Sequence, residues 1–180
     1  DNTPSPRFKG KLLAMDWVDW MNGGRPKFTM LPVQDNYPEY VKRGALNIID
    51  WIYLPDNAYL IAEVLRDIKQ NLGDGLGVAV LQKPKGRDMA VGGEGVERFC
   101  DFYFTIDFLD NYESRLSVGK VKEATCQMSG RNWAFRIEDG ATLCEIHEIV
   151  KCHEGHGDGK NFNKKCDNCD GTGYVNKGVK

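Results

Sequence analysis

Long apolar stretches are missing from this chain of 180 residues. No run approaches the roughly 20 apolar residues that a helix needs to cross a bilayer. The first residues also lack the basic segment followed by an apolar segment that marks a secretory signal peptide. We therefore expect a soluble protein of the cytoplasm, with no membrane partner.

A strong charge of either sign is missing as well. The formal net charge at pH 7 is −2, from 24 basic and 26 acidic side chains. This balance excludes a globally basic surface, so any contact with nucleic acid is expected to come from local loops. Three of the six cysteines lie in the last 30 residues, in a spacing typical of metal sites rather than disulfides. The others, Cys100, Cys126 and Cys144, are expected to be small buried residues.

Residues 45–82 have the pattern of a strand, a helix and a second strand. The runs 46–49 and 77–81 are short and apolar, which is typical of strands buried on both faces of a parallel sheet. Between them, apolar side chains recur with helical spacing at positions 61, 64, 65, 68 and 72, before glycines at 73 and 75. This order predicts two parallel strands joined by a right-handed crossover.

A polar residue follows each of these strands, Asp50 after the first and Gln82 after the second. Because ligands of open α/β sheets gather at the carboxyl ends of the strands, the two side chains are expected to form one site. A carboxylate there can hold Mg²⁺, and a neutral amide can sense a phosphate or orient a water. The alternative is that each is simply the first polar residue after a strand.

A glycine-rich stretch, KPKGRDMAVGGEGVE, occupies positions 83–97 and carries Lys83, Lys85 and Arg87. Loops of this length without structure of their own are usually functional or disordered. Beside Gln82, a mobile basic loop is suited to contact a nucleic-acid backbone. A solvated, disordered loop is the alternative.

The second half of the chain is expected to be antiparallel. After an apolar strand at 99–107, the segments 116–121, 133–137 and 143–150 alternate or nearly alternate. They predict a meander that extends the parallel sheet. Lys120 and Lys122 lie two residues apart, hence on one face of their strand. That face is either solvated or within reach of a phosphate.

The last 30 residues contain one pattern twice, as CHEGHGDG (152–159) and CDNCDGTG (166–173). Both copies resemble the CxxCxGxG repeats of DnaJ-type cysteine-rich zinc modules. Such knuckles hold a tetrahedral structural zinc ion. In the first copy, Gly155 takes the place of the second cysteine, and a degenerate knuckle without metal is the alternative. The expected ligands are Cys152, Cys166, Cys169 and His156, with His153 as the alternative to His156.

With these pieces in order, residues 7–139 resemble the carboxyl-terminal half of a RecA-type ATPase core. The likeness is closest to the DnaB-like replicative helicase ATPases of phages and mobile elements. It rests on the succession LNIIDWIYL, NAYLIAEVLRDIKQNL, VAVLQK, PKGRDMAVGGEGVERF, DFYFTID, GKVKEA and WAFRIEDG. The resemblance implies an α/β fold, with a partial RecA-like P-loop NTPase core in residues 1–150 and a zinc-knuckle tail in residues 151–180.

The resemblance also implies roles for particular residues. Asp50 matches the Walker B aspartate that orders Mg²⁺, and Gln82 matches the residue that senses the terminal phosphate of ATP. The loop 83–97 falls where that family contacts DNA. Lys120 and Lys122 fall near the lysine and arginine that are presented in trans to a neighbouring subunit's nucleotide, although a lysine at 122 lacks the forked guanidinium.

One element of that family is absent from the sequence. The chain contains no GxxxxGK[ST] pattern, which forms the phosphate cradle of P-loop ATPases. It also begins with Asp1 rather than methionine. We therefore expect the first half of the ATPase core to lie outside these residues, and the chain alone not to hydrolyse ATP.

The resemblance implies that the intact protein is an ATP-dependent helicase or translocase. It would act on single-stranded DNA during replication, as a ring or filament in the cytoplasm of a phage or bacterial host cell. A recombinase-like ATPase is the nearest alternative. A non-catalytic zinc-dependent module that binds nucleic acid or protein is the alternative from another class.

Overall fold

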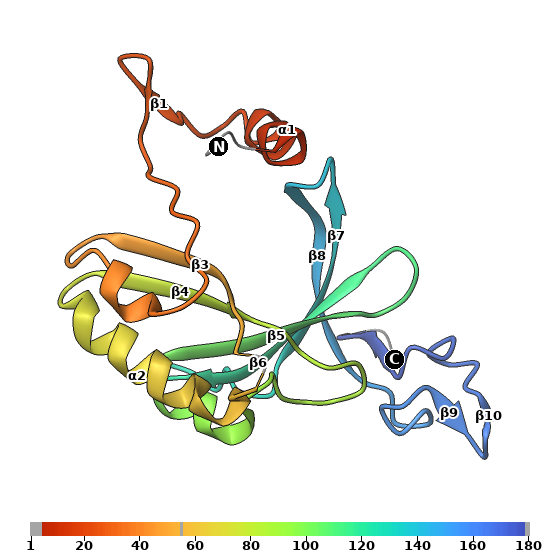
Figure 1. Cartoon of the computed structure of the whole chain (residues 1–180). Helices are drawn as coiled ribbons and strands as arrows, with labels where there is room; N and C mark the ends of the chain where they lie inside the picture. Colours follow the sequence, from red (N-terminus) through yellow and green to blue (C-terminus); the bar gives the residue numbers. More distant parts are fainter. Residues whose placement is uncertain (1–4, 55, 179–180) are drawn as a thin grey trace. The chain divides into compact units, whose positions relative to one another are not determined.

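A computed structural model describes residues 5–54 and 56–178 (Figure 1). The chain forms two compact units. The parallel unit comprises Leu31–Thr105 and Gly119–Gln127, and the antiparallel unit comprises Asp1–Met30, Ile106–Val118 and Met128–Lys180. Strands β5 (Phe102–Phe108) and β6 (Ser114–Val121) run through both units. The expected division after residue 150 stays a prediction.

The parallel unit contains the predicted strand, helix and strand. They are β3 (Leu46–Ile52), α2 (Ile61–Leu72) and β4 (Leu76–Leu81). The two strands pair in parallel, with Leu46 opposite Leu76 and Ile48 opposite Val78. The helix ends at Gly73, whose φ of 63° suits a residue without a β-carbon. The parallel pair and its crossover helix are therefore confirmed.

A small apolar core lies within the parallel unit. Its buried residues come from the 3₁₀ helix η1 (Tyr37–Tyr40), from β3, from α2 and from the 3₁₀ helix η3 (Gly93–Arg98). They are Tyr37, Ile52, Ile61, Ile68 and Val96. Burying each such side chain contributes about 1.5–3 kcal/mol. The core fixes the helix and both strands in one arrangement.

The expectation that β3 and β4 are buried on both faces is wrong. Leu72 of α2 packs so closely on one face that a β-carbon at Gly77 would lie 2.8 Å from it. On the other face Ile48 is 67% exposed and Val78 is 40% exposed. An apolar run predicts a strand, but it does not specify how many faces of that strand are covered.

The antiparallel strands form a sheet in the order β11-β8-β7-β6-β5. It adds β7 (Asn132–Glu138), β8 (Thr142–Lys151) and β11 (Tyr174–Asn176) to β5 and β6. β7 and β8 pair through a turn in which Asp139 and Gly140 have positive φ, as tight hairpins require. The predicted meander is thus confirmed.

The prediction that this meander extends the parallel sheet is wrong. Within the described residues, β3 and β4 form a two-stranded sheet of their own, separate from the five antiparallel strands. Short turns determine which strands pair along the chain, but they carry no information about lateral pairing between β4 and β5. The described part is a mixed α/β structure with mostly antiparallel pairs and two α-helices.

The remaining elements are short. α1 (Pro6–Ala14) is capped by Ser5, whose hydroxyl accepts the N–H of Phe8 at 3.2 Å. It is followed by the hairpin β1 (Met21–Asn22) and β2 (Arg25–Pro26). The tail contains the hairpin β9 (Lys160–Asn161) and β10 (Lys164–Lys165). Among residues 5–54 and 56–178, no helix has both the length and the apolar character needed to cross a membrane.

Candidate functional site

Three cysteines of the tail converge into one cluster. Cys152 directly follows β8, Cys166 directly follows β10, and Cys169 lies three residues further on. All three are buried, and their sulfur atoms lie within 4.8 Å of one another. Cys152 Sγ is 3.9 Å from Cys166 Sγ. Two thiolates on one tetrahedral zinc ion, each about 2.3 Å from it, are separated by about 3.8 Å, so the spacing fits such an ion.

Hydrogen-bond donors surround these sulfur atoms. The N–H of Gly155 donates to Cys152 Sγ at 3.2 Å, and the side-chain amide of Asn168 donates to the same sulfur at 3.4 Å. The N–H of Gly173 donates to Cys169 Sγ at 3.3 Å. The Gly155 donor lowers the pKa of Cys152, whereas burial raises the pKa of Cys166. Thiolates with such donors are soft ligands that suit Zn²⁺.

Gly155 is required by this packing. A β-carbon at this position would lie 2.8 Å from Cys169 Sγ and 3.2 Å from Cys166 Sγ. The backbone therefore approaches the sulfur atoms more closely than any side chain permits. The sequence identified Gly155 only as the position of a lost cysteine, and its contact with the other ligands comes from the structure.

The histidines lie outside the thiolate cluster. His153 and His156 are both exposed, and neither joins the three cysteines within the described residues. His156 has a left-handed backbone, with φ of 47°. The structure thus brings together three of the four expected ligands, and the fourth ligand stays a prediction. Cys100, Cys126 and Cys144 join no group of possible metal ligands among the described residues. Cys126 is exposed and Cys100 and Cys144 are half-buried, so the expectation that all three are buried is wrong.

Gln82 follows β4 as expected, but the expectation that Asp50 follows its strand is wrong, because β3 continues through Trp51 to Ile52. Asp50 belongs to β3, where alternation places it on the exposed face with Ile48. Gln82 directly follows β4 and continues the alternating series of Val78 and Val80. Both residues are exposed. The expectation that these two side chains form one site for Mg²⁺ and phosphate stays a prediction.

The loop after Gln82 is shorter than the sequence predicted. The N–H of Val91 donates to the carbonyl oxygen of Gln82 at 2.9 Å, which closes the basic segment into a compact turn. From Gly93 the chain forms η3, and Val96 is buried in the core. The expectation of a flexible loop across 83–97 is therefore wrong for its second half. Lys85 and Arg87 are exposed on the remaining turn, and Lys83 is half-buried.

Lys120 and Lys122 are both engaged within the parallel unit. The ammonium of Lys120 donates to the carbonyl oxygen of Glu97. The ammonium of Lys122 lies 2.8 Å from the carboxylate of Asp101, which also binds Lys69 at 2.8 Å. Lys122 and Lys69 together lower the pKa of Asp101 to about 2. A role in trans would require these lysines to exchange partners.

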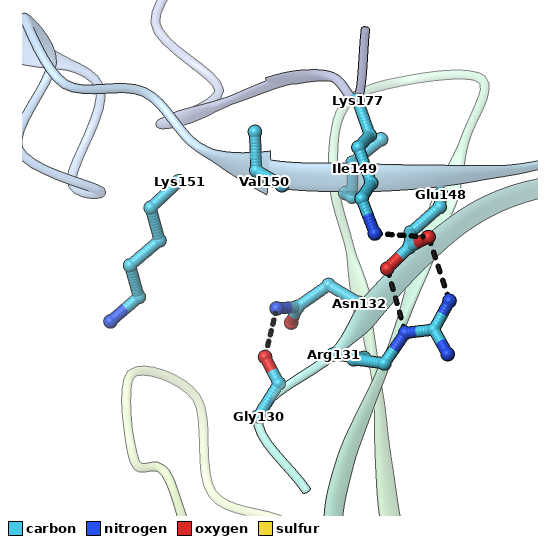
Figure 2. Close-up of a pocket in the computed structure, with 8 residues that line it drawn as sticks. All are labelled: Gly130, Arg131, Asn132, Glu148, Ile149, Val150, Lys151 and Lys177. Carbon is cyan, nitrogen blue, oxygen red and sulfur yellow. Dashed lines mark hydrogen bonds and ion pairs between the residues drawn. The ribbon is translucent and has the colours of Figure 1, made fainter. Parts of the chain in front are cut away.

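A pocket that the sequence did not reveal lies beside β7 and β8 (Figure 2). Its volume is about 320 Å³, and the side chain of Glu148 lines it. Arg131 binds both oxygens of Glu148 at 2.7 Å, and Lys177 binds one of them at 2.9 Å. These two cations lower the pKa of Glu148 to about 2. The guanidinium of Arg131 also stacks 4.9 Å from the ring centroid of Trp133.

Replacing Cys169 with serine should release the metal, because a serine hydroxyl is a poor substitute for a thiolate. We expect purified Cys169→Ser to contain almost no zinc by mass spectrometry, against about one ion per chain in the parent. Cys126→Ser is the matched control, since that thiol is exposed and outside the cluster. Full zinc retention in Cys169→Ser would mean that the ligands are misassigned. The zinc affinity of His156→Ala tests the expected fourth ligand.

Glu148→Gln should lower the melting temperature at pH 7, because Arg131 and Lys177 lose their shared carboxylate. The pKa of Glu148 falls from 4.5 to about 2 on folding, so its stabilisation is complete above pH 4.5 and lost as the pH falls towards 2. The difference in melting temperature between the parent and Glu148→Gln should therefore shrink as the pH falls from 4.5 towards 2. Glu39→Gln, at an exposed acid of the other unit, is the control. A difference that stays constant between pH 7 and pH 2 would contradict the pairing.

Comparison of the chain with protein-family models, with curated proteins and with solved structures gives no match.

Proposed function

We propose that this chain is the carboxyl-terminal part of a RecA-like, DnaB-type ATPase that moves along single-stranded DNA during replication. The observation that carries the proposal is a pair of exposed polar residues on the parallel strands, with Asp50 two residues before the end of β3 and Gln82 directly after β4. A β-α-β unit is common to many folds and activities. The polar pair on the parallel strands is what favours nucleotide chemistry.

In this proposal, ATP binds between adjacent subunits of a ring or filament in the cytoplasm of a phage or bacterial host cell. Asp50 holds Mg²⁺, which neutralises phosphate charge when bound, and Gln82 senses the terminal phosphate. Lys120 and Lys122 reach the nucleotide of a neighbouring subunit. The turn that carries Lys85 and Arg87 contacts the DNA backbone, as does Lys83. The phosphate cradle is supplied by a part of the protein outside these 180 residues.

The exposed apolar face of the parallel strands supports the same proposal. Ile48 and Val78 lie side by side in the register of β3 and β4, and both are open to solvent. Parallel sheets are usually covered on both faces. An uncovered apolar face is what part of an α/β core leaves open when the rest of that core is absent.

A non-catalytic, zinc-dependent module is the second candidate. It is favoured by the thiolate cluster, whose three buried cysteines already lie at metal-binding distances. In this candidate the parallel unit is a scaffold, and the tail binds nucleic acid or protein. A recombinase-like ATPase would use the same residues as the helicase, and assays of duplex unwinding and strand pairing separate the two.

Asp50→Ala should reduce DNA-stimulated ATP hydrolysis by about two orders of magnitude in the intact protein, because the variant loses its Mg²⁺ ligand. Its zinc content should not change, since Asp50 and the cysteines lie in different units. Asp56→Ala is the matched control, because Asp56 is an exposed acid of the turn after β3. Turnover equal to that of the parent would rule out the magnesium assignment and favour the second candidate.

Replacing Lys85 and Arg87 together with glutamine should weaken binding of single-stranded DNA. Each lost phosphate contact should lower the slope of log affinity against log salt by about 0.7, so the pair should lower it by about 1.4. Fluorescence anisotropy of a labelled oligothymidylate measures both quantities. The matched control replaces Lys9 and Lys11, which are exposed on α1. An unchanged salt slope would exclude the turn from the DNA contact.

A further inference from the structure

The hairpin of β9 and β10 ends in an aromatic side chain, Phe162, to which neither candidate function has assigned a role. Phe162 is 96% exposed, more than any other large apolar residue of the described chain. Phe162 and Asn163 form the turn, and both have a left-handed backbone, with φ of 48° and 64°. Such turns favour asparagine and glycine, and a bulky aromatic with positive φ is an outlier. An outlier at an exposed tip is a reason to infer a function.

Lysines lie directly beside this ring. Lys160 pairs with Lys165 across the hairpin, and Lys164 pairs with Asn161. Like charges directly opposite each other destabilise an antiparallel pair. Lys165 is neutralised by Asp170. Lys160 and Lys164 are exposed and have no ion-pair partner in the described part of the chain, so their charges remain available to an external anion.

The base of the hairpin is fixed on the thiolate cluster. Gly159 directly precedes β9, and Cys166 directly follows β10. The N–H of Cys166 donates to the carbonyl oxygen of Gly159 at 2.9 Å. The N–H of Lys160 donates to the carboxylate of Asp158 at 2.9 Å. Gly159 packs so closely on the second knuckle that a β-carbon there would collide with the carbonyl oxygen of Gly171. The knuckles therefore present the ring from a fixed base.

We propose that this hairpin binds single-stranded nucleic acid, with an unpaired base stacked on Phe162 and phosphates held by Lys160 and Lys164. An exposed aromatic ring offers a stacking face to any base, and nearby ammonium groups add contacts to the backbone. The ring is flanked by Asn161 and Asn163 rather than by further apolar residues. A single ring is too small an apolar surface to anchor a protein in a bilayer. The inference rests on the second candidate function, whose nucleic-acid contact it assigns to particular residues, and not on the ATPase assignment.

Phe162→Gly tests the ring without harming the fold. Glycine adopts positive φ without strain, so the variant should melt at the same temperature as the parent or higher and should keep its zinc. Its affinity for a labelled oligothymidylate, measured without nucleotide, should fall between about fivefold and a hundredfold. Replacing Lys160 and Lys164 with glutamine should lower the salt slope of binding by about 1.4.

Tyr112→Ala is the matched control for the ring. Tyr112 is 82% exposed on the turn between β5 and β6, but Asp110 and Glu113 accompany it instead of lysines. Its removal should leave DNA affinity unchanged. Parent-like DNA binding by zinc-loaded Phe162→Gly would overturn the proposal. Loss of zinc from Phe162→Gly would also overturn it, because the ring would then have a structural role. So would a Phe162→Gly variant that binds DNA like the parent but binds vesicles containing phosphatidylserine less tightly. A failure here is distinct from a failure of the ATPase proposal, because Phe162 and Asp50 lie in different units and ATP turnover of Asp50→Ala tests that proposal separately.

Discussion

The convergence of three thiols is the constraint on which the whole tail depends. Among the described residues of the tail, Val175 is the one apolar side chain that packs against Cys152, Cys166 and Cys169, so the described tail has no apolar core of ordinary size. Segments this small need a metal or a disulfide to remain folded. The two knuckles are also tied by their backbones, since Cys152 donates its N–H to the carbonyl oxygen of Gly173 at 2.8 Å. The cluster is therefore the structural centre of residues 152–173.

The antiparallel sheet depends on the same cluster through β11. This strand leaves the second knuckle and pairs with β8, with Tyr174 opposite Lys151. The guanidinium of Arg115 lies over the ring of Tyr174, 4.5 Å from its centroid. The same guanidinium lies 3.0 Å from the carboxylate of Asp107. One residue after β11, Lys177 reaches the pocket carboxylate of Glu148. The knuckles thus position a strand that completes both a cation–π contact and an ion-pair network.

The sequence predicted those features that repeat with a short period. Helical spacing located α2, and the apolar runs located β3 and β4, because local periodicity reflects local structure. It missed the pocket, because Glu148 lies 17 residues from Arg131 and 29 from Lys177, and only strand register brings them together. Cysteine spacing predicted three converging thiols. It did not determine where His156 points, because that depends on a left-handed backbone that the spacing does not specify.

The ion pairs of Asp101 bear on how the parallel unit would work in an assembly. Lys122 and Lys69 share this carboxylate, whose pKa of about 2 keeps it ionised at neutral pH. If Lys122 leaves for a phosphate on a neighbouring subunit, Lys69 still neutralises Asp101, and no bare carboxylate is left behind. Lys122 is exposed, so an exchange of one anion for another would carry little cost of desolvation. The second cation on Asp101 would thus let Lys122 change partners without leaving a buried or exposed carboxylate unpaired.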